Sequence, residues 1–69
     1  MNEQQKDKIL DILDEINNRK DVIDIDLNAH YVILKRRPQL YVHYKELIQT
    51  YKDDIEFLDK VLSFLEQFI

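Results

Sequence analysis

The strongest constraint on the fold is a stripe of apolar residues that follows Pro38, the only proline in the chain. The stripe recurs at alternating three- and four-residue steps and consists of Tyr41, Tyr44, Ile48, Tyr51, Ile55, Leu58, Leu62, Leu65 and Ile69. This spacing lines one side of an α-helix, and Pro38 suits the first position of such a helix. A helix of some 30 residues would be about 45 Å long at ~1.5 Å per residue. We therefore expect either a break at residues 52–54, where Asp53 and Glu56 resemble a capping box, or self-association through the stripe.

A second amphipathic helix is predicted over residues 3–20. Its apolar positions recur with helical spacing and include Ile9, Ile12, Leu13 and Ile16. Two asparagines followed by Arg19 and Lys20 are typical of a helix end, because cations stabilise the carbonyl pole of a helix.

The segment that follows has the two-residue period of a β-strand. Residues 21–28 alternate apolar with polar side chains, and residues 31–35 (YVILK) are β-branched and aromatic. A turn at residues 28–30 would join the two segments into a β-hairpin over residues 22–36. A short helix remains an open alternative, since one helical face would contain Ile23, Leu27, Tyr31 and Leu34.

These elements predict one small α+β domain over residues 1–69, with a helix, a β-hairpin and a long, kinked or unbroken, C-terminal helix. The alternative fold is an all-α bundle of three or four helices. A chain of 69 residues buries only a small core, and the absence of cysteine excludes disulfides. A partner chain is the expected source of additional stability.

Charge is segregated along the chain. Residues 30–45 hold four cations and no acid, whereas residues 1–29 and residues 46–69 each carry a net charge of −4. Aromatic residues interleaved with cations predict a surface for nucleic acid or an acidic partner, with cations on phosphates and rings stacked on bases. The candidate residues are Tyr31, Lys35, Arg36, Arg37, Tyr41 and Lys45. The alternative is that the cations protect an edge strand or neutralise the acidic helices.

The end of the chain is apolar on more than one side, because Phe57, Phe64 and Phe68 fall off the main stripe. This pattern predicts a protein interface on the last helix, and the alternative is a wide face directed into the core. The candidate interface residues are Tyr51, Phe57, Leu58, Leu62, Phe64, Leu65 and Phe68.

Several kinds of site are not expected. The chain has no glycine, which excludes the glycine-rich loops that bind phosphates and dinucleotides. Thr50 and Ser63 have no histidine at a spacing that one helix would bring together, and the His43–Glu46 pair has no second copy to complete a metal site. We expect no enzyme activity, no metal and no cofactor. The apolar runs are too short to enter a membrane, so a soluble cytoplasmic protein is expected.

We therefore expect a non-enzymatic accessory or adaptor protein that docks on a larger protein, or associates with itself, through an apolar helix face. Its composition, rich in Ile, Asn, Lys and Asp, suggests an AT-rich genome and a subunit or inhibitor of a phage or mobile-element DNA-processing complex. The alternative function is a nucleic-acid-binding module that uses residues 30–45.

Overall fold

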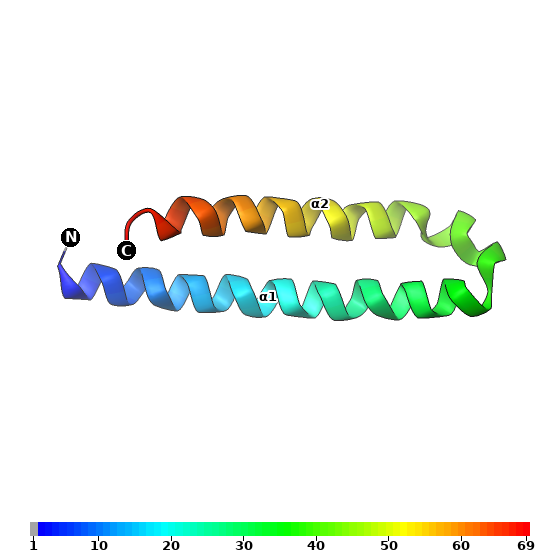
Figure 1. Ribbon diagram of the computed structural model, residues 1–69, viewed down its shortest axis with the longest axis horizontal. Coiled ribbons are helices and arrows are strands. Elements are labelled where there is room, and N and C mark those ends of the chain that lie inside the picture. Colours follow the sequence, from blue (N-terminus) through cyan, green and yellow to red (C-terminus); the bar gives the residue numbers. More distant parts are fainter. Residues whose placement is uncertain (1) are drawn as a thin grey trace.

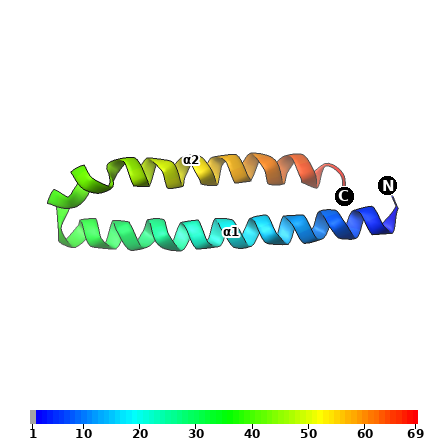
Figure 2. The same ribbon diagram turned by 180° about the vertical axis from the view of Figure 1, so that it is seen from behind.

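The protein is a hairpin of two long antiparallel helices (Figure 1). The computed structural model describes residues 2–69, in which α1 (Glu3–Arg36) and α2 (Tyr41–Glu66) are joined by a short 3-10 helix, η1 (Pro38–Leu40). The helices lie side by side over their length, and both ends of the chain lie at the same end of the rod (Figures 1 and 2). The rod measures 54 × 15 × 12 Å.

The predicted α+β fold is wrong, because residues 2–69 contain no strand. The predicted β-hairpin over residues 22–36 is instead the second half of α1. The all-α alternative fits the observed architecture, although the chain supplies two helices rather than three or four.

A continuous seven-residue repeat explains why α1 runs through the predicted hairpin. Its least exposed side chains follow each other at alternating three- and four-residue steps, and they are Ile9, Leu13, Ile16, Lys20, Ile23, Leu27, His30 and Leu34. The two-residue alternation covers only Ile23, Ile25 and Leu27, and Ile25 is 67 % exposed. Packing of the longer repeat against α2 therefore outweighs the local strand pattern. The helix end predicted at residues 17–20 is also wrong, since Lys20 occupies a position in the repeat.

The ends of α1 follow from local chemistry. The Asn2 side chain accepts a hydrogen bond from the Gln5 amide at 2.9 Å, and the Gln5 side chain accepts one from the Asn2 amide at 3.3 Å. This reciprocal capping box satisfies free amides in the first turn. At the other end Pro38 disfavours a helical backbone at the preceding residue, and Arg37 has φ −134° and ψ 74°. Pro38 then begins the short η1, whereas the α-helix at whose first position it was predicted begins three residues later, at Tyr41.

Helix α2 is unbroken from Tyr41 to Glu66, so the predicted break at residues 52–54 is wrong. Asp53 caps no helix, and its carboxylate accepts a hydrogen bond from Gln49 Nε2 at 2.9 Å within α2. The break was expected because a short first helix could not cover a long apolar stripe. Since α1 is itself 34 residues long, it covers the stripe without a kink.

The core is a single thin seam between the helices. Its buried side chains are Leu13, Leu27, Ile48 and Leu62, each 5–8 % exposed. The radius of gyration is 16.0 Å, against about 11 Å for a compact domain of this length. The accessible surface is 5630 Å², against about 4,650 Å² for a folded monomer of 8.5 kDa. The hairpin therefore exposes about a fifth more surface than a globular domain of its mass.

Candidate functional site: the two broad faces of the hairpin

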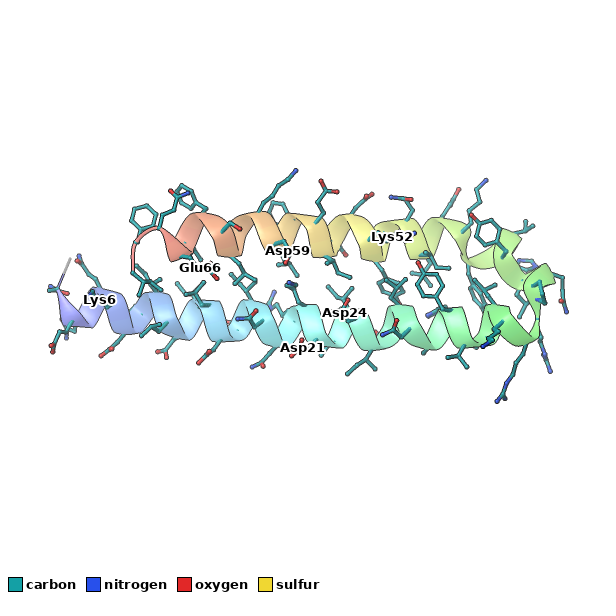
Figure 3. The ribbon with its side chains drawn as sticks, viewed as in Figure 1. Lys6, Asp21, Asp24, Lys52, Asp59 and Glu66 are labelled. Atoms are coloured by element: carbon teal, nitrogen blue, oxygen red, sulfur yellow. The ribbon has the colours of Figure 1, made fainter. Side chains whose placement is uncertain are left out.

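The seam between the helices contains one charged residue, Lys20. Its side chain is 22 % exposed. It donates a hydrogen bond to the Asp59 carboxylate of α2 and forms an ion pair with it. The Asp59 hydrogen bond raises the pKa of Lys20, desolvation opposes the rise, and the charges of Asp59, Asp24 and Asp21 support it. Figure 3 shows Asp24 and Asp59 in the strip between the two helices. A polar residue in such a seam disfavours other alignments of the helices, in which it would lack a partner.

His30 is the second polar residue of the seam. Its ring lies edge-on to the Tyr44 ring, with centroids 5.0 Å apart, and 5.6 Å from the Tyr51 ring. Its Nδ1 atom lies 2.7 Å from the Asp26 carbonyl oxygen and donates to it. His30 is therefore a packing residue between two tyrosines of α2, and its Nδ1 is occupied within α1.

The seven-residue repeat divides the remaining surface into two broad faces. We label the seven positions of the repeat a to g, so that the seam residues occupy positions a and d. In two antiparallel helices, the e positions of both helices then lie on one side of the seam and the g positions lie on the other side. Two observed contacts agree with this division. Lys52 Nζ lies 5.9 Å from the centre of the Tyr31 ring, and both residues are at e positions. Arg19 and Asp54, both at g positions, line one groove.

The face formed by the e and b positions is acidic, and we call it the charged face. Its acids are Glu3, Asp7, Asp14, Asp21, Asp24, Glu56, Asp59 and Glu66, and its cations are Lys35, Lys45 and Lys52. Figure 3 places Lys52 and Asp59 on α2 beside Asp24 on α1. This face also carries three exposed hydrophobic side chains, Leu10, Tyr31 and Val42. Charged residues outnumber them, as on the solvated side of an amphipathic helix pair.

The opposite face, formed by the g and c positions, is apolar, and we call it the apolar face. Its large apolar members are Ile12, Val22, Ile33, Leu47, Phe57, Val61, Phe64 and Phe68, and its charged members are Lys8, Glu15, Arg19, Asp26, Arg36 and Asp54. Val22 is 59 % exposed, Phe57 64 % and Phe64 58 %, although all three are large hydrophobic side chains. Phe64 and Phe68 pack edge to face at 5.3 Å, which extends the apolar area toward the open end of the hairpin.

A shallow groove of about 560 Å³ crosses the middle of the apolar face. Val22 and Ile23 of α1 and Phe57 and Leu58 of α2 form its apolar walls. Its polar rim consists of Glu15, Asn18, Arg19 and Asp54. Arg19 Nη2 donates to Glu15 Oε1 at 3.0 Å, so part of this rim is already paired within α1. An apolar floor with a polar rim is typical of a protein-docking surface.

The predicted interface residues fall into two groups. Tyr51, Leu58, Leu62 and Leu65 lie in the seam and pack toward α1, so they stabilise the hairpin itself. Phe57, Phe64 and Phe68 lie on the apolar face and remain exposed. The aromatic residues off the main stripe, rather than the stripe, are thus available to a partner.

The predicted basic surface gathers at the closed end of the rod. Lys35, Arg36, Arg37 and Lys45 are exposed around the turn, together with Tyr41, which is 55 % exposed. We call this group the basic tip. Tyr31 lies one turn before Lys35 in α1, and its ring faces Lys52 of α2. Lys35 and Arg36 also sit in the last turn of α1, where cations stabilise the carbonyl pole.

Sequence reasoning missed the roles of Lys20, His30, Ile12 and Val22. The sequence did contain a signal for Lys20 and His30. Both residues continue the three- and four-residue spacing that starts with Leu13 and Ile16 and extends to Leu34. To predict the apolar face, one would also have to know that α1 and α2 pair in antiparallel order.

No group of three or more carboxylate or imidazole side chains able to hold a metal ion occurs within residues 2–69. Over the same residues, no helix has the length and apolar character needed to cross a membrane. The chain matches no protein-family model, no curated protein and no solved structure.

Proposed function

We propose that the chain is a non-enzymatic accessory protein that works by docking its apolar face on another protein chain. The single observation that carries the proposal is the asymmetry of the two broad faces. One is acidic and solvated, whereas the other presents large aliphatic and aromatic side chains across both helices. Contiguous exposed apolar surface with a polar rim is typical of association sites in proteins of this size.

The thin core supports the same proposal. Four buried side chains give a hairpin of this length little stability of its own, and small domains commonly gain the remainder from a partner. A partner bound to the apolar face would add a second layer of buried side chains beside the seam. Binding and stabilisation of the fold would then be the same event.

A photo-crosslinking experiment in the native cells tests this proposal. A benzophenone amino acid in place of Phe57 reports on the apolar face, and the same amino acid in place of Gln49 reports on the charged face. We expect a crosslinked protein adduct from position 57 and none from position 49. Equal crosslinking from both positions, or none from position 57, would contradict the proposal.

A second candidate function, nucleic-acid binding, is supported by the basic tip. Its cations gather around exposed Tyr41 at one end of the rod, where phosphate contacts and base stacking would be close together. The net charge of −4 opposes this function for the chain alone. We therefore rank it below protein docking.

A further inference from the structure

We propose that the apolar face is covered by the apolar face of a second copy of the chain, with the two hairpins antiparallel and forming a four-helix bundle. This inference rests on the proposed function and names its partner. Each copy would place its basic tip over the open end of the other copy. The arrangement has a two-fold axis perpendicular to the long axis of the rod.

The exposed area is sufficient for such a dimer. Two separate hairpins expose twice 5630 Å², which is about 11,300 Å², whereas a globular protein of about 17 kDa exposes about 7,700 Å². The difference of about 3,500 Å² exceeds the roughly 1,200–2,000 Å² that a specific protein interface buries. An elongated dimer would bury only part of this 3,500 Å², and the buried area would still lie within the usual range for a specific interface.

The charge of the apolar face is compatible with a second copy of itself. Its acids Glu15, Asp26 and Asp54 are matched in number by the cations Lys8, Arg19 and Arg36. A face with an excess of one sign would repel its own copy at a two-fold interface, because the same patch is used twice. The acidic excess lies on the charged face, which stays in water in this arrangement.

The position of the groove supports a two-fold arrangement. Its α1 residues lie between Glu15 and Ile23, at the middle of a helix that runs from Glu3 to Arg36. A two-fold axis through the middle of the rod would therefore place the two grooves opposite each other. Phe57, which is 64 % exposed at the groove wall, would then lie in the groove of the partner copy.

Charge segregation selects the antiparallel orientation. Residues 30–45, at the closed end, carry a net charge of +4, whereas the open end carries a net charge of −2, from Glu3, Asp7, Asp11 and Glu66 against Lys6 and Lys8. A dimer with both turns at one end would bring two basic tips together. The antiparallel dimer instead separates the two tips along a 54 Å rod, far beyond the Debye length of about 8 Å at physiological salt.

The mass of the purified chain in solution tests the proposal. Light scattering at concentrations from micromolar to several hundred micromolar should give twice the 8.5 kDa chain mass. Val22→Glu should give the chain mass, since it places a carboxylate on each side of the two-fold axis. The matched control is Ile25→Glu, three residues along the same helix, 67 % exposed and off the apolar face, and it should remain a dimer. Circular dichroism checks that both variants keep their helices.

The orientation is tested with spin labels at the turn. The chain has no cysteine, so Gln39→Cys offers one labelling site at the closed end of each copy. Pulsed electron paramagnetic resonance should give a label separation close to the length of the rod. A short separation would overturn the antiparallel arrangement.

The outcomes separate this inference from the proposed function. A purified chain that stays at 8.5 kDa at every concentration would overturn the second copy as partner. If position 57 still crosslinked to a different protein in cells, docking by the apolar face would stand. Dimerisation that Ile25→Glu abolishes and Val22→Glu leaves intact would overturn the apolar face as the dimer surface.

Discussion

Lys20 of α1 donates a hydrogen bond to the Asp59 carboxylate of α2, so that an ion pair between residues 39 positions apart crosses the seam of the hairpin. Every neighbouring position of the seam repeat in α1 from Ile9 to Leu27 is aliphatic. A lysine at this place reduces packing but penalises any shift of one helix along the other. The pair therefore contributes to alignment more than to packing.

Replacing Lys20 by methionine should raise the melting temperature at neutral pH, because an apolar side chain of similar size packs better in the seam. The same change should make the alignment of the helices less specific, which broadens the amide signals of the variant in NMR spectra. Lys60→Met is the matched control, since its side chain is 75 % exposed and it should change neither property. A clear loss of stability in Lys20→Met would show that the ion pair stabilises more than packing does.

Alkaline pH should weaken the contribution of Lys20. Its pKa in the folded protein is raised above the ordinary lysine value of 10.5, so folding favours the protonated form. The resulting stabilisation is complete below the unfolded pKa and is lost as the pH rises through the folded pKa. Melting curves between pH 8 and pH 11.5 should show wild type losing stability above about pH 10.5 relative to Lys20→Met, which retains all four tyrosines. Parallel curves for the two proteins would contradict the assignment.

Truncation of the buried seam should unfold the hairpin. Ile48 and Leu62 are 5 % and 7 % exposed, and their replacement by alanine should each cost about 2–5 kcal/mol in the free energy of unfolding. Urea titration followed by circular dichroism measures this cost. Val42→Ala, at a position 79 % exposed, should stay within about 0.5 kcal/mol of wild type.

The turn depends on Pro38 because the chain offers no glycine to end α1. Pro38→Ala should allow helical backbone through Arg37 and favour one continuous helix, whose two halves pair with those of other copies. Small-angle scattering should then show a maximum dimension approaching about 95 Å for residues 3–66 at ~1.5 Å per residue. Gln39→Ala, in the same turn, should keep the 54 Å rod. An unchanged dimension in Pro38→Ala would mean that seam pairing alone determines the turn.

If the basic tip binds single-stranded nucleic acid, the affinity should fall steeply with salt. Replacing both Arg36 and Arg37 by alanine should then reduce the slope of log K against log salt by about 1.4, as expected for two lost phosphate contacts. Fluorescence anisotropy with a labelled oligonucleotide measures both slopes. The double change Lys6→Ala and Lys8→Ala, at the open end, should leave the slope unaltered. Salt-independent binding would exclude phosphate recognition by the tip.

The sequence predicted the elements with long repeats better than the elements with short ones. The stripe from Tyr41 to Ile69 spans eight steps, and the helix it predicts is present from Tyr41 to Glu66. The strand prediction rested on the alternation of Ile23, Ile25 and Leu27 and on the β-branched and aromatic run at residues 31–35. Three alternating residues cannot distinguish a strand from one side of a helix when polar side chains such as Lys20 and His30 complete the longer repeat. The same two residues concealed the length of α1 and led to the predicted break in α2.

The candidate site was predicted only in part, for a different reason. Phe57, Phe64 and Phe68 were recognised as residues off the main stripe, and they lie on the apolar face. Val22 and Ile12 join them only after α1 is paired with α2 in antiparallel order. A face shared by two helices is a property of their pairing, which no pattern within one helix contains.

The antiparallel turn also gives the hairpin a direction of folding. The contacts between His30 and Tyr44 close a loop of 14 residues, whereas the contact between Lys20 and Asp59 closes one of 39 residues. Loop closure in the unfolded chain costs about 0.9 kcal/mol more for the longer loop, because the cost grows as (3/2)RT times the logarithm of length. Pairing should therefore start beside Pro38 and extend outward like a zipper. Amide hydrogens near the turn would exchange with water last, and those near the open end first.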